Sequence, residues 1–362
     1  MSEFTPFLRS MMSVSGLSGH EAPIAKIVEE KWRPLVDELT VSRLGSLHGL
    51  KKGSLATSLP AGKRPSIMIA THMDAIGLMV TQIVGEFLHI TQVGGIDPRI
   101  LPGTPVMVHA SGAGGGEAIF GVVAQPPLRA LPPGSGDAPV PLKDLLVDIG
   151  LTAREVAARV NVGDLVSFAT EPVDLFGDVI SGHTLDNRAS IAALTVALEQ
   201  LKSCMHVWDV WAVATIQEET VLGGAYTSAF QLRPDLAVAI DVTFAKGPGA
   251  SDWKTFPLGK GPTIAVGPNM HPYLFKKFKE TADRLEIPYG IETNPTHSGT
   301  DTYAMQVSAE GIPTMVLGIP LRYMHTPVEA VALKDISRTG RLLAEFIAAL
   351  DVDFIEKITW DD

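Results

Sequence analysis

The chain has 362 residues, of which 46% are hydrophobic and 19% are charged, as expected for a globular protein with a sizeable core. Its formal net charge of −11 argues against nucleic acid or an anionic membrane as a partner, because both require a basic surface. The single cysteine, Cys204, excludes an intrachain disulfide and a cysteine-based zinc knuckle.

The N-terminal part of the chain is predicted to hold a helical segment and one buried strand. It opens without a basic stretch followed by an apolar one, and no apolar run in the chain reaches about 18 residues, so a cytoplasmic protein without a membrane span is expected. Residues 3–39 are predicted to be helical, because Ile24, Ile27 and Val28 recur at helical spacing, with acidic residues near the start. A short apolar strand is predicted over residues 66–70.

Residues 75–176 are predicted to form an inserted β-rich domain. They contain short alternating runs such as "GEFLHITQVGG" and "GTPVMVHASG", which are typical of strands. Gly- and Pro-rich breaks, "SGAGGGE" and "QPPLRALPPGSGDAPVP", separate these runs. Thr152 and Glu155 have the spacing of a capping box at the start of one short helix.

From residue 177 to residue 362, predicted strands and helices alternate. Strands are expected over 207–217, 235–243 and 312–320, and helices over 185–202, 271–288 and 335–351. Asp335 is predicted to be the N-cap of the last helix. Such alternation is typical of a mostly parallel sheet flanked by helices. The sequence therefore predicts a discontinuous α/β domain, residues 1–74 and 177–362, interrupted by the β-rich insert.

Histidine or acidic side chains lie near or just beyond the carboxyl ends of four predicted strands of the α/β part. They are His72 and Asp74, Glu218 and Glu219, Asp241, and His325, while Asp186 opens the helix beginning "LDNR". Ligands of open α/β sheets bind outside the carboxyl ends of the strands, so these side chains are expected to converge. Imidazole and carboxylate ligands without thiolate suit Zn²⁺, Co²⁺ or Mn²⁺. The set predicts two divalent metal ions about 3.5–4 Å apart, bridged by one carboxylate.

The two adjacent glutamates can take different roles. Neighbouring residues at a strand end point in different directions, so one can bind metal while the other, Glu218, faces the substrate as a general base. Asp74 has the spacing to accept from the second nitrogen of the His72 imidazole and fix its tautomer. Taken alone, each residue also has an ordinary interpretation; Asp186, for example, suits a helix N-cap. The coincidence of such residues at four strand ends, together with Asp186 at a helix start, favours the metal site.

With these residues in view, the sequence resembles the M42 family of metallo-aminopeptidases, which includes the glutamyl aminopeptidases and the tetrahedral assemblies called TET. The resemblance is carried, in order over about 72–330, by "ATHMDAIGLMV", "VGGIDPRILPG", "ISGHTLDNRAS", "TIQEETVLGGA", "AIDVTFA", "GTDTYAMQVSAEGIPT" and "IPLRYMHTPVEAV". It implies a zinc-peptidase-like catalytic domain with a PDZ-like insert that takes part in homo-oligomer assembly, from dimer up to dodecamer. It also implies two divalent ions, Zn²⁺ or Co²⁺ foremost, and peptide substrates with a free N-terminus.

The resemblance also implies a role for each site residue. Asp186 would bridge the two metals, Glu219 and His325 would complete one site, and His72 and Asp241 would complete the other. Glu218 would activate the metal-bridging water as general base, and Asp74 would orient His72. Thr300 and Asp301, in "SGTDTY", either line the substrate pocket or form a turn.

The chain departs from the family pattern at two places near the site. Ala75 stands where the family usually has Glu, and residues 220–224 read Thr-Val-Leu-Gly-Gly where the family usually has Val-Gly-Leu-Arg-Gly. Both changes leave the ligands and the base in place and bear on substrate preference.

Three other functions are alternatives to an aminopeptidase. They are another co-catalytic metallohydrolase, such as a carboxypeptidase or N-deacylase, a cellulase-like glycoside hydrolase acting through two carboxylates, and a non-enzymatic scaffold.

Overall fold

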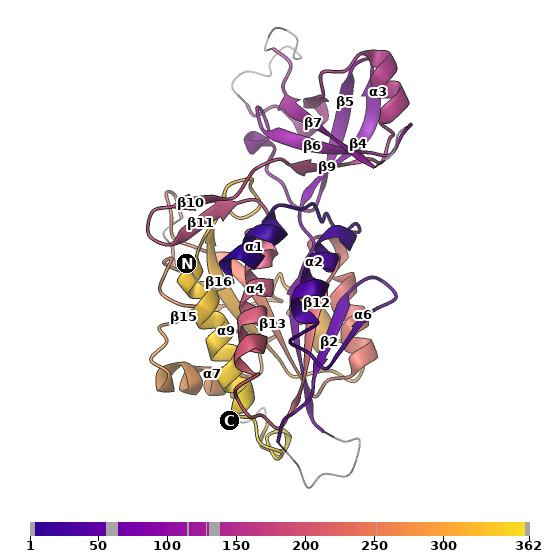
Figure 1. The fold of residues 1–362 in the computed structure, drawn as a ribbon. Coiled ribbons are helices and arrows are strands. Elements are labelled where there is room, and N and C mark those ends of the chain that lie inside the picture. The colour runs from indigo at the N-terminus through magenta and orange to yellow at the C-terminus, as the bar shows by residue number, and fades with distance from the viewer. Residues whose placement is uncertain are drawn as a thin grey trace. The chain divides into compact units, whose positions relative to one another are not determined.

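The computed structural model describes residues 4–55, 64–113, 116–127, 129, 138–250 and 252–358, and Figure 1 traces their fold. The chain divides into two compact units. The larger unit comprises residues 1–74, 172–324 and 329–362, and the smaller comprises residues 75–171 and 325–328. Every helix in the described part of the chain is too short or too polar to cross a membrane.

A mixed sheet forms the centre of the larger unit. Its strand order is β1 (Glu38–Val41), β2 (Leu47–Lys51), β12 (Asp209–Thr215), β3 (Ser66–His72), β13 (Leu236–Phe244), β16 (Thr314–Arg322), β17 (Glu329–Ala332), β11 (Val179–Gly182) and β10 (Val173–Leu175). A side branch adds β14 (Thr263–Val266), which pairs with β16 and with β15 (Gly290–Thr293). The four central strands, β12, β3, β13 and β16, run parallel, whereas the flanking strands are antiparallel.

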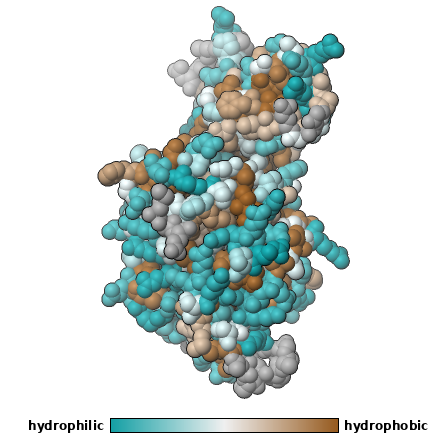
Figure 2. All heavy atoms as spheres, viewed as in Figure 1, coloured by the Kyte–Doolittle hydropathy of each residue, from teal (hydrophilic) through white to brown (hydrophobic). Residues whose placement is uncertain are grey.

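Helices cover both faces of this sheet, as Figure 1 shows. They are α1 (Thr5–Met12), α2 (Ala22–Trp32), α4 (Leu185–Gln200), α5 (Glu218–Val221), α6 (Gly223–Leu232), α7 (Pro272–Arg284), α8 (Asp301–Gln306) and α9 (Leu333–Ala348), with a 3-10 turn at Ile355–Lys357. Alternate residues of β3 pack into two different hydrophobic clusters, because successive side chains of a strand point to opposite faces of the sheet. Ile67 and Ile69 pack with α4 and α9, whereas Met68 and Ala70 pack with α6 and α8. Hydrophilic side chains cover most of the larger unit on the face in Figure 2.

The helices differ from the sequence expectation in two parts of the chain. The helical segment predicted over residues 3–39 is in fact two helices, α1 and α2, separated by a loop whose Gly19 has a φ of +85°. Its predicted end is also wrong, because residues 38–39 belong to the strand β1. The last helix begins earlier than predicted, with Ala332 as its N-cap. Asp335 is instead buried inside that helix and accepts hydrogen bonds from the backbone N–H groups of Gly259 and Gly261.

The smaller unit is a closed antiparallel barrel. Its strands, in the order β4-β5-β8-β7-β6-β9, are β4 (Gly77–Val84), β5 (Phe87–Val93), β8 (Leu146–Asp148), β7 (Glu117–Ala124), β6 (Pro105–Ala110) and β9 (Leu165–Phe168). Two 3-10 turns, Pro98–Ile100 and Leu142–Asp144, and the helix α3 (Ala153–Arg159) complete it. The capping box of Thr152 and Glu155 is confirmed. The breaks predicted at 111–117 and 125–141 fall partly outside the described residues.

The predicted fold class is confirmed. A mixed α/β sheet flanked by helices carries a small closed barrel of six antiparallel strands. The parallel character that the sequence predicts is found in the central strands, where buried apolar runs are paired on both sides. The antiparallel additions at the sheet edges are short strands that the alternation of strands and helices does not reveal.

Candidate functional site

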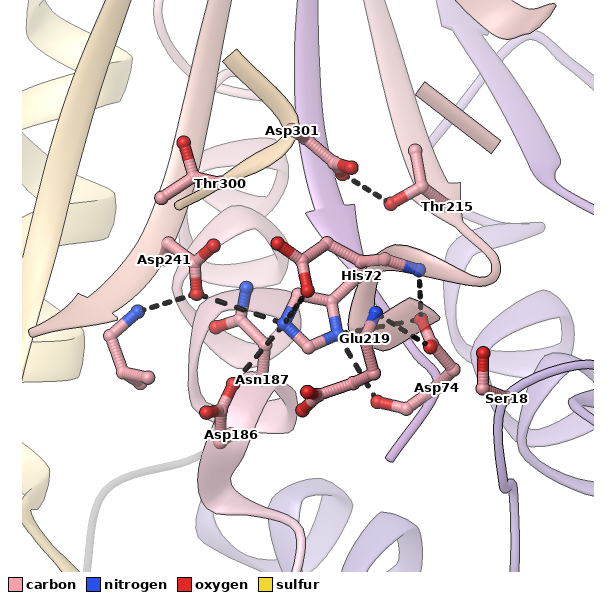
Figure 3. A network of polar contacts seen from close by, with 12 residues as sticks. Ser18, His72, Asp74, Asp186, Asn187, Thr215, Glu219, Asp241, Thr300 and Asp301 are labelled. Carbon is pink, nitrogen blue, oxygen red and sulfur yellow. Dashed lines mark hydrogen bonds and ion pairs between the residues drawn. The ribbon is translucent and has the colours of Figure 1, made fainter. Parts of the chain in front are cut away.

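The site lies where the central parallel strands end. β3 ends at His72, which pairs in register with Thr215 at the end of β12, and Asp241 lies in the neighbouring strand β13. Parallel pairing brings the carboxyl ends of these strands to one edge of the sheet. His72 and Asp241 are both buried there. Figure 3 shows Asp241 and Asp186 on one side of the His72 ring and Asp74 on the other.

Carboxylate oxygens surround one nitrogen of the His72 ring. The Nε2 atom lies 3.1 Å from Asp186 Oδ1, 3.7 Å from Asp241 Oδ1 and 3.8 Å from Glu218 Oε2. The other nitrogen, Nδ1, lies 3.1 Å from the backbone carbonyl oxygen of Asp74 and 3.5 Å from its carboxylate. When Nδ1 donates to that carbonyl, Nε2 turns a lone pair toward three acceptors. This arrangement is favourable only if Nε2 gains a proton or a metal ion lies between these atoms.

The electrostatics of the buried cluster lead to the same conclusion. Burial acts to lower the pKa of His72, but the surrounding carboxylates, Glu218 foremost, outweigh burial and raise that pKa well above its usual value. Burial raises the pKa of the Glu218 carboxyl well above its usual range, against the opposing effect of His72. Burial also raises the pKa of Asp301 to about 7. Crowded acids that hold protons in this way can exchange them for a metal ion.

The turn after β12 presents the paired glutamates. Gln217 adopts a left-handed conformation with φ 56° and ψ 30°, and the short helix α5 begins at Glu218. The N–H of Glu218 donates to Asp74 Oδ1 at 3.0 Å, and the N–H of Glu219 donates to Asp74 Oδ2 at 3.2 Å. Asp74 is completely buried. Its carboxylate therefore anchors the backbone of this turn, in addition to lying beside His72.

Asp186 occupies an irregular start of α4. Its backbone is non-helical, with φ −80° and ψ 102°, and the Asp186–Asn187 peptide bond is cis. The N–H of Asp186 donates to the buried Glu329 at 3.1 Å, and the Asn187 amide donates to the carbonyl of Ile240 at 3.0 Å. Since Ile240 immediately precedes Asp241, this bond ties the start of α4 to the ligand-bearing part of β13.

The structure brings most of the predicted ligands together. Within the larger unit, candidate ligand atoms lie within 4.8 Å of one another in two groups, His72 with Asp186 and Asp241, and His72 with Glu218 and Glu219. His325 follows β16 in the short segment 325–328, which groups with the smaller unit. The part of His325 in the centre stays a prediction.

Two more acidic residues lie near this centre; the sequence offers Asp301 as a pocket-lining or turn residue, and it offers no such role for Glu21. Asp301 is buried and accepts a hydrogen bond from Thr215 Oγ1 at 2.5 Å, at the end of β12. The neighbouring Thr300 is the N-cap of α8, as the turn interpretation predicts. Glu21 is also buried, and it accepts from the backbone N–H of Gln217 at 3.1 Å. The only sequence pattern at Glu21 is that of an acidic residue near a helix start. That pattern predicts an interaction with the helix and does not predict the contact with Gln217.

The donor set fits divalent metal ions. Among the residues that the structure describes, six carboxylates gather around one imidazole, namely those of Asp74, Asp186, Glu218, Glu219, Asp241 and Asp301. Oxygen and imidazole donors without thiolate suit Zn²⁺, Co²⁺ or Mn²⁺. The exposed fraction of the side chains of Asp186, Glu218 and Asp241 is below one tenth, so a bound cation would be strongly attracted with little screening by water.

Comparison with known proteins identifies the chain. Residues 53–342 match the family model described as M42 glutamyl aminopeptidase. The chain is 33% identical to the lysyl aminopeptidase of Pyrococcus furiosus over 95% of its own length and 96% of that protein. The aminopeptidase APDkam598 from the archaeon Desulfurococcus kamchatkensis has a TM-score of 0.89 at 31% identity, covering 99% of this chain and 98% of that one. The Pyrococcus horikoshii TET1 peptidase, which can assemble into a tetrahedron or a large octahedral shell, has a TM-score of 0.80 at 28% identity, covering 96% of this chain and 100% of that one. The chain therefore belongs to the M42 glutamyl aminopeptidase family of hydrolases.

Proposed function

We propose that this protein is a two-metal aminopeptidase that removes N-terminal residues from peptides with a free amino terminus. The observation that carries the proposal is the crowding of Asp186, Asp241 and Glu218 around the Nε2 atom of His72 at the end of the parallel strands. Membership of the M42 family supports the aminopeptidase reaction.

In this proposal the metal ligands follow the family pattern. Asp186, His72, Asp241, Glu219 and His325 would hold the two ions, with Asp186 shared between a site of His72 and Asp241 and a site of Glu219 and His325. Zn²⁺ and Co²⁺ are the favoured ions for this donor set. When bound, the ions supply polarisation of the scissile carbonyl and acidify the attacking water.

Glu218 is assigned as the general base. It takes a proton from the attacking water, whose oxygen forms the new bond to the scissile carbonyl carbon. As the C–N bond breaks, Glu218 passes that proton to the leaving amine, which yields a free amino acid and a peptide shortened by one residue. The bond from its own N–H to Asp74 fixes the backbone from which Glu218 projects.

The first test compares a short peptide with its N-acetylated twin, on protein reconstituted with Zn²⁺ or Co²⁺. We expect kcat/KM for the acetylated peptide to be lower by about 10⁴-fold, because a site built to bind a charged amine rejects an analogue that lacks it. Mass spectrometry should show the free peptide losing one residue at a time from its N-terminus. Equal cleavage of the two peptides would contradict the aminopeptidase assignment.

The alternatives predict different substrate dependence. A carboxypeptidase would be blocked by amidation of the peptide C-terminus, which an aminopeptidase ignores. An N-deacylase would prefer the acetylated substrate. A two-carboxylate glycoside hydrolase would cleave glucans without metal, and it leaves the buried His72 at the centre of the acids without a role.

We further propose that the protein acts in the cytoplasm as a homo-oligomer, between a dimer and a dodecamer, and that the barrel unit takes part in assembly. The proposal rests on the likeness to oligomeric TET peptidases. Sedimentation of the purified protein is expected to give a mass of at least two chains. A single-chain mass over the working concentration range would overturn this part of the proposal.

A further inference from the structure

Three successive backbone N–H groups of the turn that carries Glu218 are bound by two buried acids. The N–H of Glu218 and the N–H of Glu219 donate to the carboxylate of Asp74. The N–H of Gln217 donates to Glu21 Oε1 at 3.1 Å. A left-handed residue followed by right-handed ones turns successive N–H groups inward, which makes a concave site for anionic oxygens. The turn is thus held from two sides.

Glu21 makes this contact from a distant part of the chain. It immediately precedes α2, but its side chain makes no capping bond to that helix. One oxygen, Oε1, accepts from Gly19 N at 2.7 Å and from Gln217 N, which is 196 residues away. Burial raises the pKa of Glu21, and the nearby carboxylate of Asp74 raises it further. Placing two acids this close costs free energy, so their shared turn is the feature that accounts for the arrangement.

A second contact ties the same loop to the same turn. Ser18 Oγ lies 2.9 Å from Thr220 Oγ1, and Ser18 is seen at the edge of the network in Figure 3. Thr220 is one of the positions at which this chain departs from the usual family pattern. Leu17 is buried beside Ser18, so the loop is anchored in the core. A Cβ atom added to Gly16 would lie 2.6 Å from Ile24 Cγ2, which shows how tightly the loop packs.

We propose that Glu21 is a positioning residue for Glu218. Its carboxylate holds the N–H of Gln217 and so fixes the direction in which the next side chain, the general base, projects. Glu21 acts through Glu218 rather than on the substrate. The inference rests on the proposed function only in taking Glu218 as the base; the hydrogen bond and its effect on the turn do not depend on the reaction.

Replacing Glu21 by Ala is expected to lower kcat by about 10- to 100-fold, because an error of about 1 Å in placing a catalytic group costs about that much. KM is expected to stay within about 3-fold, since substrate binding groups are unchanged. Glu21→Gln keeps an oxygen able to accept both N–H groups and is expected to retain kcat within about 3-fold. Glu30→Ala, at an exposed position of α2, the helix that Glu21 precedes, is the matched control and should behave as wild type.

The Glu21→Asp variant distinguishes the effect of side-chain length from the effect of negative charge. It keeps the negative charge but shortens the side chain by one methylene, so the oxygen no longer reaches Gln217 and kcat is expected to fall as in Glu21→Ala. This variant also carries the test if the alanine variant does not fold. Normal kcat in Glu21→Asp and Glu21→Ala would overturn the proposal, and so would equal losses in Glu21→Gln and Glu21→Ala.

Hydrogen exchange measured by mass spectrometry tests the same inference without catalysis. In metal-free protein, a peptide covering residues 216–222 should exchange faster in Glu21→Ala than in wild type, and at the wild-type rate in Glu21→Gln. If the wild-type protein cleaves no peptide, the proposed function fails, while the exchange result still decides the role of Glu21. Unchanged exchange in Glu21→Ala would overturn the inference even in an active enzyme.

Discussion

Replacing Glu218 by Gln is expected to lower kcat by about 10²- to 10⁴-fold while the protein keeps the metal content of the wild type. The amide has the size of the carboxylate but cannot take a proton from water at neutral pH. The assay is steady-state hydrolysis of a free-amine peptide, paired with metal analysis of the same sample.

Glu219→Gln is the matched control for this prediction. The two glutamates are adjacent, and both belong to a group of possible ligands with His72. If Glu219 is the ligand, its amide variant loses bound metal, and its activity recovers in part when metal is supplied in excess. Loss of metal from Glu218→Gln and not from Glu219→Gln would exchange the two roles. A near-normal rate in Glu218→Gln would show that neither the geometry nor the family pattern identifies the base.

Removal of metal by a chelator is expected to abolish peptide hydrolysis and to lower the Tm. Ions that bind only the folded protein stabilise it by about 2.7 kcal/mol at 100 times their Kd. The apo protein also retains the crowded acids around His72, whose mutual repulsion a divalent ion relieves. We expect the Tm to fall by at least about 5 °C and to recover, with the activity, when Zn²⁺ or Co²⁺ is added.

The control for metal removal is Asp186→Asn. Asp186 is the nearest carboxylate to His72 Nε2 and the proposed bridge, so its amide variant should bind metal weakly and show little change in Tm with chelator. Activity that persists after complete metal removal would contradict the two-metal reaction. It would favour a glycoside hydrolase that acts through two carboxylates.

The central part of the site follows from local sequence patterns. Apolar runs predict β3 and β13, and the rule that parallel strands bring their carboxyl ends to one edge predicts that His72 and Asp241 meet. The structure places them together, with Nε2 and Oδ1 separated by 3.7 Å. The division of roles between Glu218 and Glu219 is a different matter. It stays a prediction, because both side chains leave the same short turn and belong to one group of possible ligands with His72.

Other features could not be predicted from the sequence, because the same local pattern of residues occurs in two different structural environments. An acid at a helix start suits a cap, and Asp335 has that pattern, yet it binds the N–H groups of a loop that lies 74 to 76 residues earlier in the chain. Glu21 has the same pattern and binds Gln217. The helical segment predicted over residues 3–39 rests on the spacing of Ile24, Ile27 and Val28, which does not show where α1 and α2 separate or that β1 begins at Glu38. Such partners are set by tertiary contacts that no short window of sequence contains.

The order in which the site residues occur along the chain has a consequence for biosynthesis. β3, the start of α4 and β13 supply His72, Asp186 and Asp241 in that order, and the barrel unit is made between the first two. A ribosome-bound chain that ends before β13 contains His72, Asp186, Glu218 and Glu219 but lacks Asp241, and β3 has no partner strand on that side of the sheet. If a metal ion requires Asp241, it is expected to bind only after β13 has paired with β3, so it would stabilise the nearly complete fold rather than initiate folding.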